Sequence, residues 1–208
     1  LRIRNILPDF PKGKERYFEY KQNFLKIKNK KKLKQIGKSI LLRRLTGKKD
    51  YSLPYMRNNT YSKFIDNSSI KKLEKKNKII IFTHCFFDSP HKHRKMLFED
   101  FYEQLNFILS LSKYNKKYNW FIKPHPASFF QNDKIIKQIL LQNYTNVTLL
   151  DKNTSNAYIA NSKPKLIITD HGTIAHEMAY FGIPVLNTGD NPHINYDFNI
   201  HANSRNHI

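Results

Sequence analysis

Residues 169–173, Thr-Asp-His-Gly-Thr, have the side chains and spacing of a phosphate-binding turn. An apolar run precedes them, Gly172 lets a ligand approach the backbone closely, and a helical pattern begins at Thr173. Unpaired N–H groups at the start of a helix, together with its positive end, favour an anion. Glu177 follows one helical turn later, where a carboxylate can accept hydrogen bonds from a ribose diol. In the alternative interpretation, Thr173 only caps the helix and Glu177 is a solvated surface carboxylate.

A second candidate is the sequence Lys123-Pro124-His125-Pro126, which directly follows another apolar run. The two prolines restrict the backbone on both sides of His125 and take it out of helix and sheet. A rigidly held imidazole can donate to a phosphate oxygen, and Lys123 adds positive charge. The His-Pro pair is common by itself, and its position after a predicted strand is what gives it weight.

The loop of residues 84–94 contains three histidines, an aspartate and the chain's single cysteine, Cys85. Its spacing fits no zinc pattern and there is no second cysteine, so we expect no metal site. Because an imidazole titrates near neutrality, His84 or Asp88 is a candidate for proton transfer. Two further side chains of this loop are candidate phosphate contacts: Ser89 and Arg94.

A polar loop follows the last apolar run and contains Asp190 and Asn191. These two residues are candidates for contact with a sugar or an acceptor. The alternative is that the segment is a plain polar connection.

Short apolar runs and helical patterns alternate in the second part of the chain. We expect strands at residues 79–83, 120–123, 147–150, 166–169 and 183–186. We expect helices at residues 96–111, 133–141, 155–161 and 173–181. This alternation predicts an α/β fold with a doubly wound parallel sheet, whose ligands bind at the carboxyl ends of the strands.

The positive charge belongs to the first third of the chain. Residues 1–78 hold 24 Lys and Arg against 6 Asp and Glu, whereas residues 79–208 hold 13 against 10. We therefore divide the chain into a basic, partly helical region, residues 1–77, and a domain, residues 78–208. We interpret the first region as irregular apart from a short helix at residues 38–45 and a helix or linker at residues 70–78, and as part of a larger domain. It lacks an aromatic ladder or a helix-turn-helix, so we expect no specific nucleic acid, although a basic nucleic-acid-binding module is the alternative from another class.

The His-Pro segment, the 169–173 turn and the spacing of Glu177, Gly182 and Pro184 together resemble the donor-binding domain of GT-B glycosyltransferases. The His-Pro pair is similar to that of bacterial sialyltransferases, capsule Kdo transferases and CDP-glycerol glycerophosphotransferases. Those families usually carry serine on the later turn, where this chain has His171-Gly172-Thr173.

The resemblance implies a Rossmann-like domain that binds a nucleotide-activated sugar and transfers the sugar to a capsule or surface polysaccharide, or to a lipid-linked acceptor, without a metal or other cofactor. The implied donor phosphate ligands are Lys123, His125, His171, Gly172 and Thr173, with Glu177 on the ribose. The implied catalytic candidates are His84, Asp88 and His125. Transfer of glycerophosphate from CDP-glycerol is the nearest alternative. One cysteine favours a reducing cytoplasm, and the basic region suits contact with anionic lipid at the inner face of the cell membrane.

Overall fold

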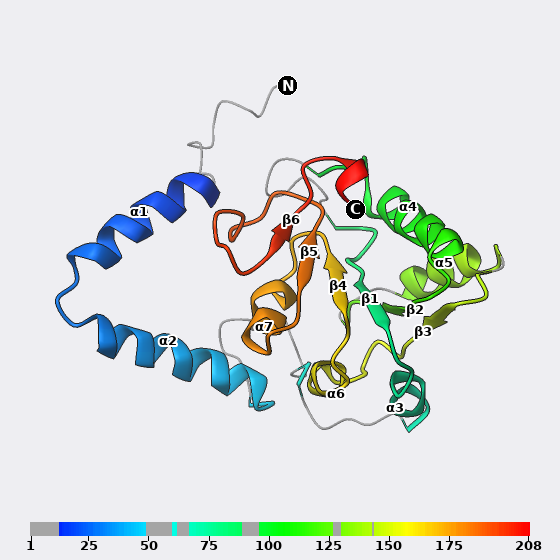
Figure 1. Cartoon of the computed structure of the whole chain (residues 1–208), viewed down its shortest axis with the longest axis horizontal. Helices are drawn as coiled ribbons and strands as arrows, with labels where there is room; N and C mark the ends of the chain where they lie inside the picture. Colours follow the sequence, from blue (N-terminus) through cyan, green and yellow to red (C-terminus); the bar gives the residue numbers. More distant parts are fainter. Residues whose placement is uncertain (1–12, 49–59, 62–66, 89–95, 127–129, 143) are drawn as a thin grey trace.

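A six-stranded, fully parallel sheet forms the centre of the chain (Figure 1). The computed structural model describes residues 13–48, 60–61, 67–88, 96–126, 130–142 and 144–208. The strands are β1 (Lys78–Phe82), β2 (Asn119–Lys123), β3 (Val147–Leu149), β4 (Leu166–Thr169), β5 (Val185–Asn187) and β6 (Ile200–His201). Their order, β3-β2-β1-β4-β5-β6, is that of a Rossmann sheet. The predicted α/β fold with a doubly wound parallel sheet is confirmed.

Helices cover both faces of this sheet. The helices of the domain are α3 (Asn67–Leu73), α4 (Phe101–Tyr114), α5 (Phe130–Leu140), α6 (Asn156–Asn161) and α7 (Ile174–Tyr180), followed by the 3₁₀ helix η2 (Arg205–His207). Successive side chains of a strand point to opposite faces. In β1, Ile80 packs with residues of α3, α6 and α7, whereas Ile79 and Ile81 pack with residues of α4 and α5. Burial on both faces explains why the central strands consist of uninterrupted apolar residues.

The five predicted strands are present within one or two residues of their expected bounds, and β6 is the strand that the pattern missed. A strand of two residues is too short to produce a periodic pattern in the sequence. The prediction of a helix at residues 96–111 was wrong at its start, because α4 begins only at Phe101. Asp100 caps this helix by accepting a hydrogen bond from the N–H of Glu103, and Glu103 accepts one from the N–H of Glu99. Met96 instead forms an antiparallel bridge with Gly189, in the loop that follows β5.

Two helices precede the domain and stand away from it, at the left of Figure 1: α1 (Gly13–Lys26) and α2 (Lys30–Leu45). The predicted helix at residues 38–45 is present as the last part of α2, but the prediction that the residues before it are irregular was wrong, because α1 and the start of α2 are helical. Most side chains of both helices are exposed, so the apolar stripe that usually marks a helix in sequence is weak. The pair meets the domain through Tyr17, whose ring lies 4.8 Å from that of Tyr196, and through the last turn of α2.

None of the helices in the described part of the chain combines the length and apolar character that crossing a bilayer requires.

Candidate functional site

A cavity opens where the strand order reverses, outside the carboxyl ends of β1 and β4. Strands β2 and β3 continue the sheet on one side of this point, and β5 and β6 on the other. Doubly wound sheets bind their ligands in the crevice at this position, because the connections leave in opposite directions there. The residues that line it come from the ends of β1, β2 and β4, from α6 and α7, and from α2.

His125 and Thr173 line this same cavity, although they follow different strands. Gly172 and His84 line it as well. Burial lowers the pKa of His125, the nearby charge of Lys123 lowers it further, and the Asp88 carboxylate acts in the opposite direction. A neutral imidazole still carries one N–H donor for a ligand oxygen.

Lys123 also lines the cavity, but its ammonium is directed at the backbone. Its Nζ donates to the carbonyl oxygens of Pro124 and Lys152, and the side chain is almost completely buried. Burial lowers its pKa to about 7, and Asp151 opposes that shift. The lysine is therefore only partly protonated at neutral pH and is held by neighbouring carbonyl groups.

Glu177 faces partners from the first region of the chain. Its carboxylate is 1% exposed and pairs with the Arg44 guanidinium, with 2.7 Å between Nη2 and Oε1. The hydroxyl of Tyr61 donates to the other oxygen, Oε2, over 2.8 Å. A ribose diol would have to displace one of these groups to reach Glu177, so the structure favours a positioning role for this carboxylate over the expected ribose contact. The Thr173 hydroxyl accepts from Arg44 at 3.0 Å and makes no capping hydrogen bond with α7.

Two polar atoms of the cavity wall are buried with neither a hydrogen-bond partner nor an ion pair among the described residues. They are Oγ1 of Thr83, at the end of β1, and Oδ1 of Asn156, at the start of α6. Buried polar groups are nearly always paired in folded proteins, and an unpaired one costs roughly 1–3 kcal/mol. Both atoms are therefore placed to pair with a ligand.

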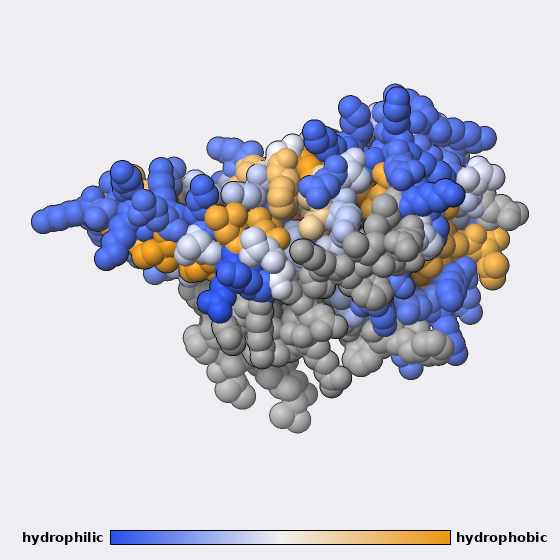
Figure 2. Space-filling model, turned by 90° about the horizontal axis from the view of Figure 1, so that it is seen from below, coloured by the Kyte–Doolittle hydropathy of each residue, from blue (hydrophilic) through white to orange (hydrophobic). Residues whose placement is uncertain are grey.

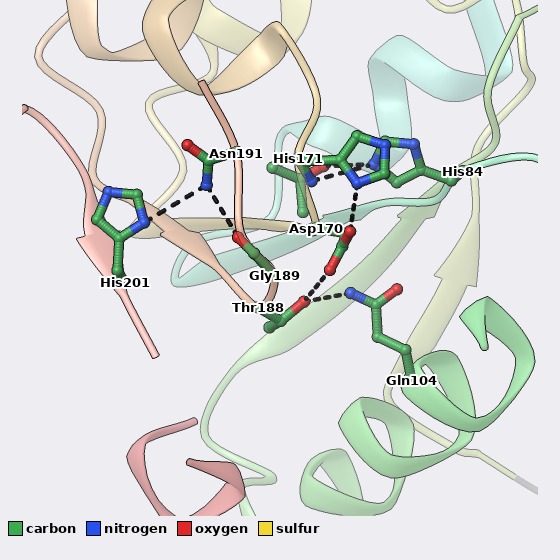
Figure 3. A network of polar contacts seen from close by, with 9 residues as sticks. His84, Gln104, Asp170, His171, Thr188, Gly189, Asn191 and His201 are labelled. Atoms are coloured by element: carbon green, nitrogen blue, oxygen red, sulfur yellow. Dashed lines mark hydrogen bonds and ion pairs between the residues drawn. The ribbon is translucent and has the colours of Figure 1, made fainter. Parts of the chain in front are cut away.

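His84, His171 and Asp170 form a connected group beside the cavity (Figure 3). The rings of His84 and His171 lie 4.4 Å apart, and the backbone N–H of His171 is directed at Nε2 of His84 over 3.5 Å. Nδ1 of His171 pairs with Oδ2 of Asp170. A carboxylate on Nδ1 fixes the orientation of an imidazole and leaves Nε2 to accept a proton.

A second layer of residues holds the Asp170 carboxylate, which is itself 1% exposed. Thr188 donates to its Oδ1 over 3.3 Å, and the side-chain amide of Gln104 on α4 donates to the Thr188 hydroxyl. Gly189 lies so near that a Cβ at this position would be 2.3 Å from Oδ1 of Asp170. The absence of a side chain at Gly189 is what leaves room for this carboxylate.

Asp190 and Asn191, expected near a sugar or acceptor, do not line the cavity at the strand ends. Asn191 is buried and donates to the carbonyl of Gly189 (Figure 3). Its Oδ1 accepts from the N–H of His193. These bonds shape the loop after β5. Ser89 and Arg94 lie outside the residues that the structure describes.

The described part of the chain holds no group of three or more His, Cys, Asp or Glu side chains placed to bind a metal ion. This includes the described start of the histidine-rich loop.

Several residues of the site were not predicted from sequence, among them Arg44, Tyr61 and Gln104. Arg44 is one of many basic residues in its region, and nothing local distinguishes it from its neighbour Arg43. Gln104 lies on the inner face of α4, where a polar residue among apolar ones is a weak signal of a buried hydrogen bond.

The fold and the cavity define a Rossmann-like α/β domain with a polar site at its topological switch point. No protein-family model and no curated protein sequence matches the chain. Among the solved structures that resemble it are two of KpsC from Thermosulfurimonas dismutans. With the β-Kdo 2,4 transferase it shares 12% identity and a TM-score of 0.48, over 84% of this chain and 50% of that one. With the β-Kdo 2,7 transferase it shares 15% identity and a TM-score of 0.41, over 80% of this chain and 50% of that one. The chain thus spans about half the length of either protein, and the fold assignment made here rests on the strand order.

Proposed function

We propose that this chain is the donor-binding part of a GT-B type glycosyltransferase, which moves a sugar from a nucleotide to a capsule or surface polysaccharide or its lipid-linked precursor. The observation that carries the proposal is the meeting of His125 and Thr173 in one cavity at the switch point of the sheet. The His-Pro segment and the turn before α7 are the features that resemble such enzymes, and they converge on the place where doubly wound sheets bind nucleotides.

In this proposal the nucleotide lies across the carboxyl ends of β1 and β4. The bond between the anomeric carbon and the phosphate oxygen breaks, and negative charge grows on the departing phosphate. The N–H of His125 and the backbone at Gly172 and Thr173 stabilise that charge from fixed positions, which is electrostatic catalysis and requires no metal. Asp88, whose charge acts on His125, supports the protonation of this imidazole.

The acceptor hydroxyl attacks the anomeric carbon and must lose its proton. We assign this proton to His171, because Asp170 holds the ring by Nδ1 and leaves Nε2 as the basic atom. His171 does not itself line the cavity, whereas His84, whose ring lies 4.4 Å from that of His171, does line it and is the second candidate to take this proton. These roles replace the direct phosphate contact expected for His171.

Titration calorimetry of the whole chain with CMP, CDP, UDP and GDP tests the proposal. We expect one nucleotide to bind at least tenfold more tightly than the others. We expect the His125→Ala variant to bind that nucleotide more weakly than the natural chain does. Absence of binding by all four would contradict the proposal. If CDP binds, assays with CDP-glycerol and CDP-sugars separate glycerophosphate transfer from sugar transfer, because only the former leaves CMP as product.

The helices α1 and α2 supply a surface for an anionic membrane, where lipid-linked acceptors are found. Basic side chains cover much of α2, and apolar ones lie among them on the part of the surface at the left of Figure 2. Phe18, Leu25, Ile36 and Ile40 are exposed in this pair of helices. Exposed apolar residues flanked by lysines are typical of helices that lie in the lipid headgroup region.

A further inference from the structure

One positively charged side chain that lines the cavity comes from outside the sheet domain. Arg44 is in the last turn of α2 and lines the cavity together with His84 and His125. Its side chain is 15% exposed, so the guanidinium is largely withdrawn from solvent yet borders the cavity.

The guanidinium is held from behind by groups that fix its orientation. Nη2 lies 2.7 Å from Oε1 of Glu177 and donates to Oγ1 of Thr173 at 3.0 Å. Tyr61 donates to Oε2 of the same carboxylate, and burial, followed by the charge of Glu177, raises the pKa of Tyr61. A carboxylate as buried as Glu177 requires a paired cation, and this requirement keeps Arg44 at the cavity wall.

Arg44 supplies the permanent positive charge among the described residues that line the cavity. Burial lowers the pKa of Lys123 to about 7, and its Nζ donates hydrogen bonds to two backbone carbonyl groups. Burial likewise lowers the pKa of His125. A guanidinium remains charged at every physiological pH, and its planar array of N–H donors matches phosphate oxygens.

The cavity wall also contains buried oxygen atoms that can accept a hydrogen bond from a ligand. Thr83 and Asn156 contribute the two buried oxygens that lack partners among the described residues, and an amide oxygen can only accept. A ligand that satisfies the whole cavity therefore carries an anionic group for Arg44 and hydroxyl or amino donors for Asn156. A nucleotide has both.

We propose that Arg44 binds a phosphate of the nucleotide, and that Glu177 and Tyr61 are positioning residues that hold its guanidinium. The nucleotide site is then completed by α2, although all its other predicted ligands belong to the sheet domain. This inference rests on the proposed nucleotide-binding function and names a residue and a contact within that site.

The test compares nucleotides with nucleosides on the whole chain, by calorimetry with CMP and cytidine, UMP and uridine, and GMP and guanosine. The Arg44→Gln variant would leave Glu177 buried without its cation, so the main variant is the double substitution Arg44→Gln/Glu177→Gln, which removes both charges. Arg44→Lys is the conservative variant, and Arg43→Gln, which removes an exposed arginine one position earlier, is the matched control.

We expect the double variant to bind the preferred nucleotide at least tenfold more weakly while its affinity for the matching nucleoside changes by less than twofold. Arg44→Lys should fall between, and Arg43→Gln should bind as the natural chain does. The inference is overturned if the double variant keeps its nucleotide affinity, or if nucleoside affinity falls equally, since the loss would then be structural. A natural chain that binds nucleotides no better than nucleosides removes the proposed function and this inference together.

Discussion

Gly189 and Asp170 are in contact across the ends of two neighbouring strands, with room for a hydrogen but not for a methyl group between them. A Cβ at Gly189 would lie 2.3 Å from Oδ1 and 2.8 Å from Cγ of Asp170. The carboxylate is buried and bonded to both His171 and Thr188, so a shift away from an added Cβ would strain or break these bonds. The smallest residue is therefore required where the loop after β5 passes Asp170, the carboxylate that holds the candidate base His171.

Gly189→Ala should lower the free energy of unfolding by about 1–3 kcal/mol, the usual cost of overpacking a filled interior. Urea denaturation measures this change. Gly37→Ala is the control, because Gly37 lies in α2 with nothing within 4 Å of an added Cβ. That substitution should stabilise the chain by roughly 0.5–1 kcal/mol through helix propensity. Equal effects of the two substitutions would show that the Asp170 contact does not constrain the loop.

Asp170→Asn tests the assignment of His171 as the base. An amide keeps the size of the side chain but no longer stabilises the imidazolium that forms when His171 takes the proton. We expect the rate of sugar transfer to fall by about 10²–10⁴-fold, while the dissociation constant of the nucleotide changes less than twofold, because Asp170 does not line the cavity. Transfer assays and calorimetry measure the two quantities. The control is Asp197→Asn, at an exposed position; transfer at the natural rate in Asp170→Asn would remove His171 from the mechanism.

The depressed pKa of Lys123 predicts a pH-dependent stability. Its folded pKa is about 7, below the usual 10.5, so between these values the unfolded chain holds a proton that the folded chain has released. The free energy of unfolding of the natural chain, relative to Lys123→Met, should therefore rise with pH by about 1.4 kcal/mol per unit above pH 7. Below pH 7 both states are protonated and the difference should be constant.

Urea denaturation of both proteins between pH 6 and about 10 measures this window. The Lys34→Met variant, which removes an exposed lysine of α2, is the control for a change in net charge. A Lys123→Met curve parallel to that of the natural chain over the whole range would mean that Lys123 stays charged in the folded state.

Replacement of Lys30, Lys31 and Lys32 by glutamine should weaken the binding of the whole chain to anionic vesicles. Each lysine near such a surface contributes about 1 kcal/mol, so the three together predict a loss of roughly a hundredfold. Flotation with phosphatidylserine-containing vesicles measures this loss. The matched control replaces Lys113, Lys116 and Lys117, which are exposed at and after the end of α4 and carry the same charge. Equal losses in both variants, or equal binding to phosphatidylcholine vesicles, would show that α2 has no specific part in the contact.

The fold class and the edge of the sheet where the site lies could both be predicted from the amino-acid sequence. Strands buried on both faces consist of apolar residues alone, as in 79–81 and 166–168, and this property is visible without a structure. Since the carboxyl ends of parallel strands share one edge, the polar residues after them, including His125 and Thr173, were predicted to meet.

The contacts that these residues make depend on how distant parts of the chain pack and could not be predicted from the sequence. Arg44 and Tyr61 reach Glu177 from distant parts of the chain, and Gln104 reaches Asp170 through Thr188. The partner of a buried polar group is set by how helices and loops pack, and local spacing carries no record of that packing. For the same reason Glu177 was predicted as a ligand of ribose from its place on the helix. Its ion pair with Arg44 depends on the packing of α2 against the domain, which the sequence does not show.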